Sequence, residues 1–307
     1  MARLFDITKA INSNGAISML SRFGPIIIIL ISMASVQGSS SLAKHLFPIL
    51  GPSGMAAWRL VFSSIMLLLI FKPWRKPVTK QAWKYIILYG LALGFMNLTY
   101  YCAIKRIPIG IAVAIELTGP IVVAMFAARK MIDFIWLAIA IIGLVMLLPI
   151  HNASRDLDLV GVILALCAGS CWAMYIVFGR KAGQLQGASS VALGSVIVSF
   201  IIFPIGVWQS GEVMFSLDVL PLALLVALLA SAIPYALDMI AMPKVPALTF
   251  STLMSLSPVL GALSGLIFLD ETLSSYQWLS ISLIIISSIG TVLSISHKPK
   301  ITSLDAN

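Results

Sequence analysis

The chain has 307 residues, of which 60% are hydrophobic and only 10% are charged, and its mean hydropathy is +1.05. A water-soluble domain carries about 25% charged residues, and it must hide most of its large apolar side chains from water. This composition excludes an ordinary soluble protein and indicates a bundle of helices embedded in a lipid bilayer. The net charge of +9 does not indicate a nucleic-acid-binding protein, because the basic residues stand at the ends of apolar runs.

Ten apolar runs are long enough to span a bilayer, which takes about 20 apolar residues. They occupy residues 24–43, 52–71, 83–102, 108–128, 132–150, 158–178, 188–208, 218–240, 246–268 and 273–295. Turn-forming or charged residues separate the runs, and no connection is long enough for a soluble domain. The first run lacks the cleavage site of a secretory signal peptide, so we interpret it as the first membrane helix.

The predicted fold class is therefore an all-α membrane protein with ten transmembrane helices in two five-helix halves. Residues 1–22 are expected to form a cytoplasmic N-terminal tail, and residues 296–307 a cytoplasmic C-terminal tail. The halves are expected at residues 23–150 and 158–295.

The distribution of Lys and Arg predicts that both termini are cytoplasmic, since cytoplasmic loops carry an excess of these residues. With the N-terminus inside, fifteen of the 20 Lys and Arg residues fall on the cytoplasmic side and four fall outside, while Arg59 lies within the second helix. The acidic residues outside the helices, such as Asp158, Glu212 and Asp270, lean toward the outer side.

A repeat is visible in the segments at 105–108 (KRIP) and 243–246 (PKVP), each of which opens an apolar helix. Each is followed by a proline twelve residues after its own: Pro108 by Pro120, and Pro246 by Pro258. Both pairs are separated by 138 residues. Because each half contains five helices, the second half must enter the membrane from the opposite side. Such inverted repeats are typical of secondary transporters, whose substrate site lies where the halves meet. We expect the fourth and ninth helices, broken by Pro120 and Pro258, to line that site.

Five segments of the chain stand out as motifs: residues 32–38 (SMASVQG), 71–75 (FKPWR), 108–120 (PIGIAVAIELTGP), 252–258 (TLMSLSP) and 267–273 (IFLDETL). Together they resemble the EamA-type carriers of the drug/metabolite transporter superfamily. The resemblance extends from about residue 24 to residue 295. It implies two inverted five-helix halves in the bacterial inner membrane, and efflux driven by the proton gradient. The implied cargo is a small neutral amino acid such as threonine or homoserine; other amino acids, purine metabolites and drugs remain alternatives.

Three ionisable side chains fall at membrane depth, where such residues are costly and usually functional. Glu116 lies nearest the centre of its span and is expected to exchange protons or to bind a substrate ammonium; the alternative is a neutral carboxyl bonded to a neighbouring helix. Arg59 could hold a substrate carboxylate through two hydrogen bonds, or pair with Glu116. Asp238 could be a gate residue, or merely a solvated one.

Uncharged polar and aromatic side chains complete the candidate site by offering hydrogen bonds to a small zwitterion. These are Gln37, Asn97, Tyr101, Thr118, Trp172, Tyr175, Tyr235 and Ser255. Any single serine or threonine among them could equally join two helices. The three cysteines and three histidines have no metal-ligand spacing, and no cofactor motif or enzyme signature is present. We therefore expect a transporter whose partners are a small solute, protons and lipid.

Overall fold

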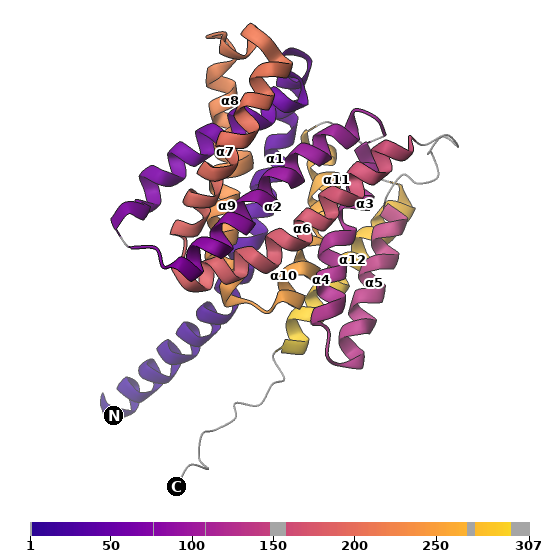
Figure 1. Cartoon of the computed structure of the whole chain (residues 1–307). Helices are drawn as coiled ribbons and strands as arrows, with labels where there is room; N and C mark the ends of the chain where they lie inside the picture. The colour runs from indigo at the N-terminus through magenta and orange to yellow at the C-terminus, as the bar shows by residue number, and fades with distance from the viewer. Residues whose placement is uncertain (1, 76, 108, 148–157, 269–273, 296–307) are drawn as a thin grey trace.

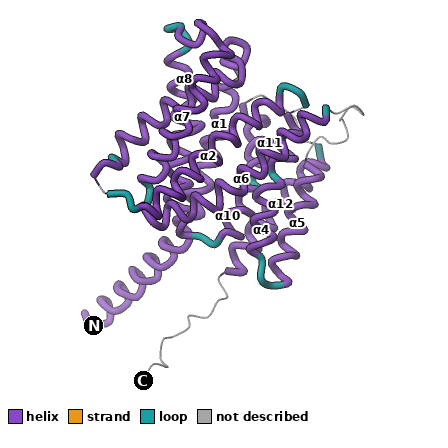
Figure 2. Tube along the Cα trace, viewed as in Figure 1, coloured by secondary structure: helices purple, strands orange, loops and turns teal. Residues whose placement is uncertain are grey.

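The computed structural model describes residues 2–75, 77–107, 109–147, 158–268 and 274–295, and these segments fold into helices joined by short loops (Figure 2). The first half contains α1 (Ala2–Phe71), α2 (Lys80–Ile104), α3 (Ile109–Glu116), α4 (Thr118–Ala127) and α5 (Met131–Leu147). The second half contains α6 (Leu159–Gln186), α7 (Ser189–Ser210), α8 (Leu220–Ala227), α9 (Ile233–Ala241), α10 (Ala247–Met254), α11 (Ser257–Phe268) and α12 (Ser275–Ile295). Short 3-10 or π turns lie between some of them, including η3 (Gly211–Phe215), η4 (Leu228–Ala232) and η5 (Met242–Lys244).

The described helices have the length and composition of membrane spans. Six of them are long and apolar enough to cross a bilayer, at Ser53–Arg75, Lys80–Ile104, Leu159–Gln186, Ser189–Phe215, Leu220–Lys244 and Ser275–Ser294. Shorter apolar helices accompany them within the described residues, at Phe23–Ser39, Ile111–Ala127, Met131–Met146 and Ala247–Leu263. The chain is an all-helical membrane protein, as its composition predicts.

Helix α1 contains the first two predicted spans and turns back on itself at Gly51, whose backbone has φ 64° and ψ 172°. This left-handed φ is open to glycine because glycine has no Cβ. The hydroxyl of Ser210 donates to the carbonyl of Leu50 at 2.6 Å and so ties this turn to the end of α7. Helix α1 begins at Ala2, so the segment expected to be an N-terminal tail is helical and projects beyond the bundle (Figure 1).

The bundle has two ends, which Figure 1 allows the reader to follow. The end where α1 begins and α12 finishes is here called the terminal end; it also holds the connections α4–α5, α6–α7 and α9–α10. The opposite end, here called the far end, holds the turn at Gly51 and the segment η3 after α7.

Glycines permit close helix crossings inside the bundle. Helix α2 packs against both α6 and α7. A Cβ at Gly90 would lie 2.7 Å from the carbonyl oxygen of Gly194, so α2 and α7 touch backbone to backbone there. Such small-residue contacts are a main source of helix association in membranes, because the hydrophobic effect does not drive helices together in lipid.

The fourth and ninth predicted spans are both broken, as their prolines predict. Helix α3 ends at Glu116 and α4 starts at Thr118, while α10 ends at Met254 and α11 starts at Ser257. A proline has no N–H to donate to the carbonyl four residues earlier. Pro120 therefore leaves the carbonyl of Glu116 without its helical donor, and Pro258 does the same to Met254.

Helix α6 accommodates the first break because it carries Gly169 at the contact. A Cβ at Gly169 would lie 2.8 Å from the carbonyl oxygen of Glu116 and 3.1 Å from the hydroxyl of Thr118. A Cβ at Gly119 would in turn clash with the carbonyl oxygen of Gly169. The absence of a side chain at both positions lets α6 touch the broken backbone directly.

At the far end, an ion pair links the α2–α3 connection to the start of α6. Arg106 Nη1 lies 2.8 Å from Asp158 Oδ2, and Asp158 Oδ1 also accepts from the backbone N–H of Val160. The hydrogen bond from Arg106, together with that from Val160, holds the pKa of the Asp158 carboxyl below its ordinary value. The pair is solvent-exposed, so it contributes little to stability.

Replacing Gly169 by alanine tests the close contact at the first break. We expect Gly169→Ala to destabilise the protein by about 1–3 kcal/mol, because the new methyl group overpacks against backbone that cannot move aside. The matched control is Gly24→Ala, since a Cβ at Gly24 has no atom within 4 Å. Thermal unfolding in detergent measures both variants, and a Gly169→Ala protein as stable as Gly24→Ala would contradict the packing described.

Candidate functional site

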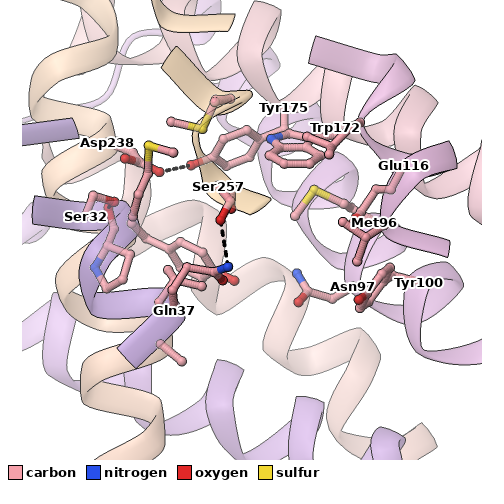
Figure 3. Close-up of a pocket in the computed structure, with 18 of the residues that line it drawn as sticks. Ser32, Gln37, Met96, Asn97, Tyr100, Glu116, Trp172, Tyr175, Asp238 and Ser257 are labelled. Atoms are coloured by element: carbon pink, nitrogen blue, oxygen red, sulfur yellow. Dashed lines mark hydrogen bonds between the residues drawn. The ribbon is translucent and has the colours of Figure 1, made fainter. Parts of the chain in front are cut away.

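A cavity of about 270 Å³ lies in the interior of the bundle, beside both broken helices (Figure 3). Sites for small molecules usually measure about 300–1,000 Å³, so this volume suits a small solute. The wall is formed by α1, α2, α3, α6, η4, α9, α10 and α11, together with Leu117 at the first break. The cavity is therefore shared between the two halves of the chain.

Nine of the thirteen residues singled out from the sequence line this cavity. They are Gln37, Arg59, Asn97, Glu116, Trp172, Tyr175, Tyr235, Asp238 and Pro258. Figure 3 shows Asp238 and Ser32 on one side of the cavity and Glu116 with Met96 on the other, while Gln37 and Ser257 lie between them. Residues from distant parts of the chain thus converge on one site.

The other four predicted residues lie outside the lining. Tyr101 contacts the site indirectly, because it accepts a hydrogen bond from Arg59. Thr118 is exposed and its hydroxyl donates to the carbonyl of Ile115 at 2.6 Å. Ser255 is buried and donates to the carbonyl of Thr252 at 2.6 Å, so it completes the turn at the second break. Pro120 is buried in the first turn of α4, directly after the first break.

Sequence reasoning missed eleven lining residues, most of them apolar or without charge. They are Ser32, Met33, Val36, Met96, Tyr100, Val113, Leu117, Ala230, Pro234, Met254 and Ser257. Helical spacing offered a signal for several, because Met33 precedes Gln37 by one turn and Tyr100 follows Asn97 by nearly one. Pro234 carried the clearest signal, since it is a mid-span proline like the two that were recognised.

Pro234 shapes the site through the carbonyls that it leaves unbonded. The helix widens into the π turn η4 just before it, and Pro234 has no N–H for the carbonyls four and five residues earlier. Those carbonyls accept from side chains instead: Ser35 Oγ donates to Leu229 at 2.6 Å, and Arg59 Nη2 donates to Ala230 at 2.9 Å. In a bilayer such carbonyls need a donor from the protein or from a cavity.

Arg59 is fixed by its bond to Ala230 and by two further hydrogen bonds. Its Nε donates to Ser231 Oγ at 3.0 Å and its Nη1 donates to Tyr101 Oη at 2.5 Å. A guanidinium has five N–H donors, and three of them make these bonds. Arg59 and Tyr235 both line the cavity. Among the described residues Arg59 makes no ion pair with Glu116, so the pairing considered from the sequence is not formed in this structure.

The two carboxyl groups of the cavity also lack a basic partner within the part of the chain that the structure describes. Glu116 has no hydrogen bond from its side chain to a described residue, and Tyr100 is its electrostatic neighbour. Asp238 is only 9% exposed, so it is not the solvated residue considered as an alternative. Its Oδ2 accepts from Tyr175 Oη at 3.5 Å, while its Oδ1 is buried without a described donor.

Large buried side chains lie between the cavity and the terminal end. Tyr89, Met239 and Phe250 each lie nearer that end than any lining residue on the same helix, and all three are buried. Tyr89 fits between α6 and α7, because Gly179 and Gly194 leave room for its ring. The ring of Tyr89 also stacks near that of Tyr175, with centroids 5.1 Å apart.

The chain belongs to the EamA-like transporter family, whose model matches residues 23–149 and again residues 159–293. The double match and the family's name agree with a membrane transporter rather than an enzyme.

Relatives with full-length similarity carry a more specific name. The threonine/homoserine exporter RhtA of Escherichia coli (strain K12) is 45% identical over 293 residues, which are 95% of this chain and 99% of that protein. The protein of the same name from Salmonella typhimurium (strain LT2) is 46% identical over 281 residues, or 92% of this chain and 95% of that one. A solved crystal structure with 16% identity has a TM-score of 0.75 and covers 89% of this chain and 98% of its own, so it shares the fold.

The hydroxyl of Tyr101 is expected to stabilise the protein through Arg59. Tyr101→Phe leaves one charged donor without its acceptor, which costs about 1.5–3 kcal/mol for a hydrogen bond to a charged group. Tyr276→Phe is the control, because Tyr276 is exposed on α12. Thermal unfolding in detergent measures the difference, and equal unfolding temperatures for the two variants would show that Tyr101 does not hold Arg59.

Proposed function

We propose that this protein exports small neutral amino acids, threonine and homoserine first among them, across the bacterial inner membrane in exchange for protons. The observation that carries the proposal is the internal cavity, which presents a fixed cation, Arg59, and two carboxyls, Glu116 and Asp238, that have no ion pairs among the described residues. The names of the full-length relatives support the same cargo.

The charges of the cavity are suited to a zwitterion. An α-amino acid carries one carboxylate and one ammonium, so it gains opposite partners in a cavity that offers both signs. The planar guanidinium of Arg59 is held by the protein and can donate two parallel hydrogen bonds to a carboxylate. Its orientation is set before the substrate arrives, which lowers the entropic cost of binding.

Helix contacts support an inverted repeat of two five-helix halves. An inverted repeat predicts that each contact recurs when every helix is replaced by its equivalent in the other half. The packing of α2 on α6 then corresponds to the packing of α9 on the first part of α1, and both contacts occur. The packing of α4 on α6 should likewise be mirrored by α11 on α1, which is also present. The breaks at Leu117 and Ser255 are separated by 138 residues, the same offset as Pro120 and Pro258.

The repeat gives a route to alternating access, in which two related halves rock around a shared site. Tyr89, Met239 and Phe250 lie buried on the terminal side of the cavity, and we infer that they close it there. With the fifteen-to-four distribution of basic residues, the terminal end is the cytoplasmic one. The structure then corresponds to a state whose cytoplasmic side is shut, and the opposite rocking motion would open it.

Glu116 is the proposed proton carrier. Its carboxyl lies in the cavity wall beside a helix break, and no described hydrogen bond commits it to one charge state. Burial away from water favours the neutral form, whereas contact with a cationic substrate or with water favours the ionised form. Release of the proton on one side and uptake on the other would couple the two movements.

The lining also favours a second cargo class of bulkier solutes, namely other amino acids, purine metabolites or drugs. Met33, Met96, Met254 and Trp172 contribute adaptable apolar surface to the wall. A competition panel against threonine would separate the two cargo classes.

Transport into inside-out vesicles tests the proposed function. We expect radiolabelled threonine to accumulate when the lumen is made acidic, because protons then leave the lumen as threonine enters. Glu116→Gln should abolish the stimulation by the pH gradient, since an amide cannot carry the proton.

The matched control is Glu212→Gln, which makes the same change on the exposed segment η3. It should transport as the unaltered protein does. Absence of threonine uptake by the unaltered protein would reject the cargo, whereas gradient-driven uptake by Glu116→Gln at the full rate would reject only the role of Glu116.

A further inference from the structure

Asp238 stands out among the buried acidic residues because its own surroundings leave it unsatisfied. It lies on α9, one turn after Pro234, and its carboxyl is part of the cavity wall. Tyr175 reaches Oδ2 only at 3.5 Å, at the limit of a hydrogen bond, and no described donor reaches Oδ1. The hydroxyl of Ser32 lies within reach of the carboxyl, but its own donated hydrogen bond runs to the carbonyl of Pro234 at 3.2 Å.

A second aspartate of the same chain shows what a structural role looks like at equal burial. Asp133, at the start of α5, is also 9% exposed. Its Oδ2 accepts from the backbone N–H groups of Arg129 and Lys130 at 2.9 and 3.0 Å. These bonds cap the turn before the helix and satisfy the carboxylate. Asp238 caps no turn or helix among the described residues, and burying a carboxylate without enough donors costs free energy.

Because Asp238 lines the cavity, a bound solute can supply a partner for its carboxyl that the described residues do not. An ammonium group suits the position, because it supplies three N–H donors and the charge that a carboxylate requires. The rings of Tyr175 and Tyr235 belong to the same wall and can face a cation as well. In Figure 3 Asp238 lies near Ser32, on the side of the cavity opposite Glu116, and the hydroxyl of Tyr175 reaches toward it from beside Trp172.

Helix α9 also relates Asp238 to the guanidinium of Arg59. Arg59 is bonded to the carbonyl of Ala230, and Asp238 follows Ala230 by eight residues, slightly more than two helical turns. Eight residues of a regular α-helix end about 80° away from the starting direction. The wider π turn η4 reduces this drift, and Ala230, Pro234 and Asp238 all face the cavity.

We propose that Asp238 is the subsite for the α-ammonium group of the transported amino acid, with Arg59 holding the α-carboxylate. The inference rests on the proposed function of amino-acid transport. It assigns different roles to the two carboxyls of the cavity. Asp238 binds the cargo, and Glu116, on the opposite wall, can still bind and release the proton. It also makes the positive charge of the cargo a requirement for tight binding.

Equilibrium binding to the purified full chain tests this assignment with two ligands. One is radiolabelled threonine, and the other is 2,3-dihydroxybutanoate, in which a hydroxyl replaces the ammonium. The unaltered protein should bind threonine at least about tenfold more tightly than the analogue, which equals about 1.4 kcal/mol. Asp238→Asn should weaken threonine binding by a similar factor and leave the analogue nearly unchanged, so the preference disappears.

Asp133→Asn is the control, because it makes the same change at the same burial away from the cavity; it should keep the preference. If Asp238→Asn is not obtained as a folded protein, Asp238→Ser removes the same charge and carries the same expectation. A full preference for threonine in a folded neutral variant would overturn the role of Asp238 and leave the proposed function standing. Failure of the unaltered protein to bind threonine or homoserine would overturn both.

Discussion

The structure depends on backbone carbonyls that have lost their helical donors inside an apolar environment. Pro120, Pro234 and Pro258 each remove an N–H from the middle of a membrane span, and lipid cannot replace it. At Pro234 the chain meets this cost with side chains of α1, because Ser35 donates to the carbonyl of Leu229 and Arg59 to that of Ala230. The cavity lies where these three interruptions face one another, because interrupted backbone is tolerated only beside protein or a cavity.

This constraint explains the arrangement of charges in the site. Arg59 is held by Tyr101, Ser231 and Ala230, so it does not neutralise either carboxyl. Glu116 and Asp238 lie on opposite walls, and neither has a basic partner among the described residues. A site that satisfied its own charges would have little affinity for a zwitterion. The unsatisfied groups are therefore the property that makes the cavity suitable for binding and releasing an amino acid.

The sequence predicts much of this architecture because membrane spans and prolines leave strong local signals. The apolar runs, the breaks near Pro120 and Pro258, and the charged candidates Arg59, Glu116 and Asp238 all follow from residue type and spacing. The hydrogen bonds of Arg59 do not follow, because its partners lie 42 to 172 residues away and depend on tertiary packing. Tyr101 accepts a hydrogen bond from Arg59, whereas Tyr100 lines the cavity. Sequence spacing alone does not show which of two adjacent tyrosines faces the cavity.

An experimental structure of the full chain in lipid nanodiscs with saturating threonine tests the central claim most directly. The account predicts density for one threonine in the cavity, with its carboxylate at Arg59, its ammonium on the wall formed by Asp238 and Tyr175, and Glu116 across from it. Threonine density at another place in the bundle, with this cavity filled by side chains or lipid, would contradict the account.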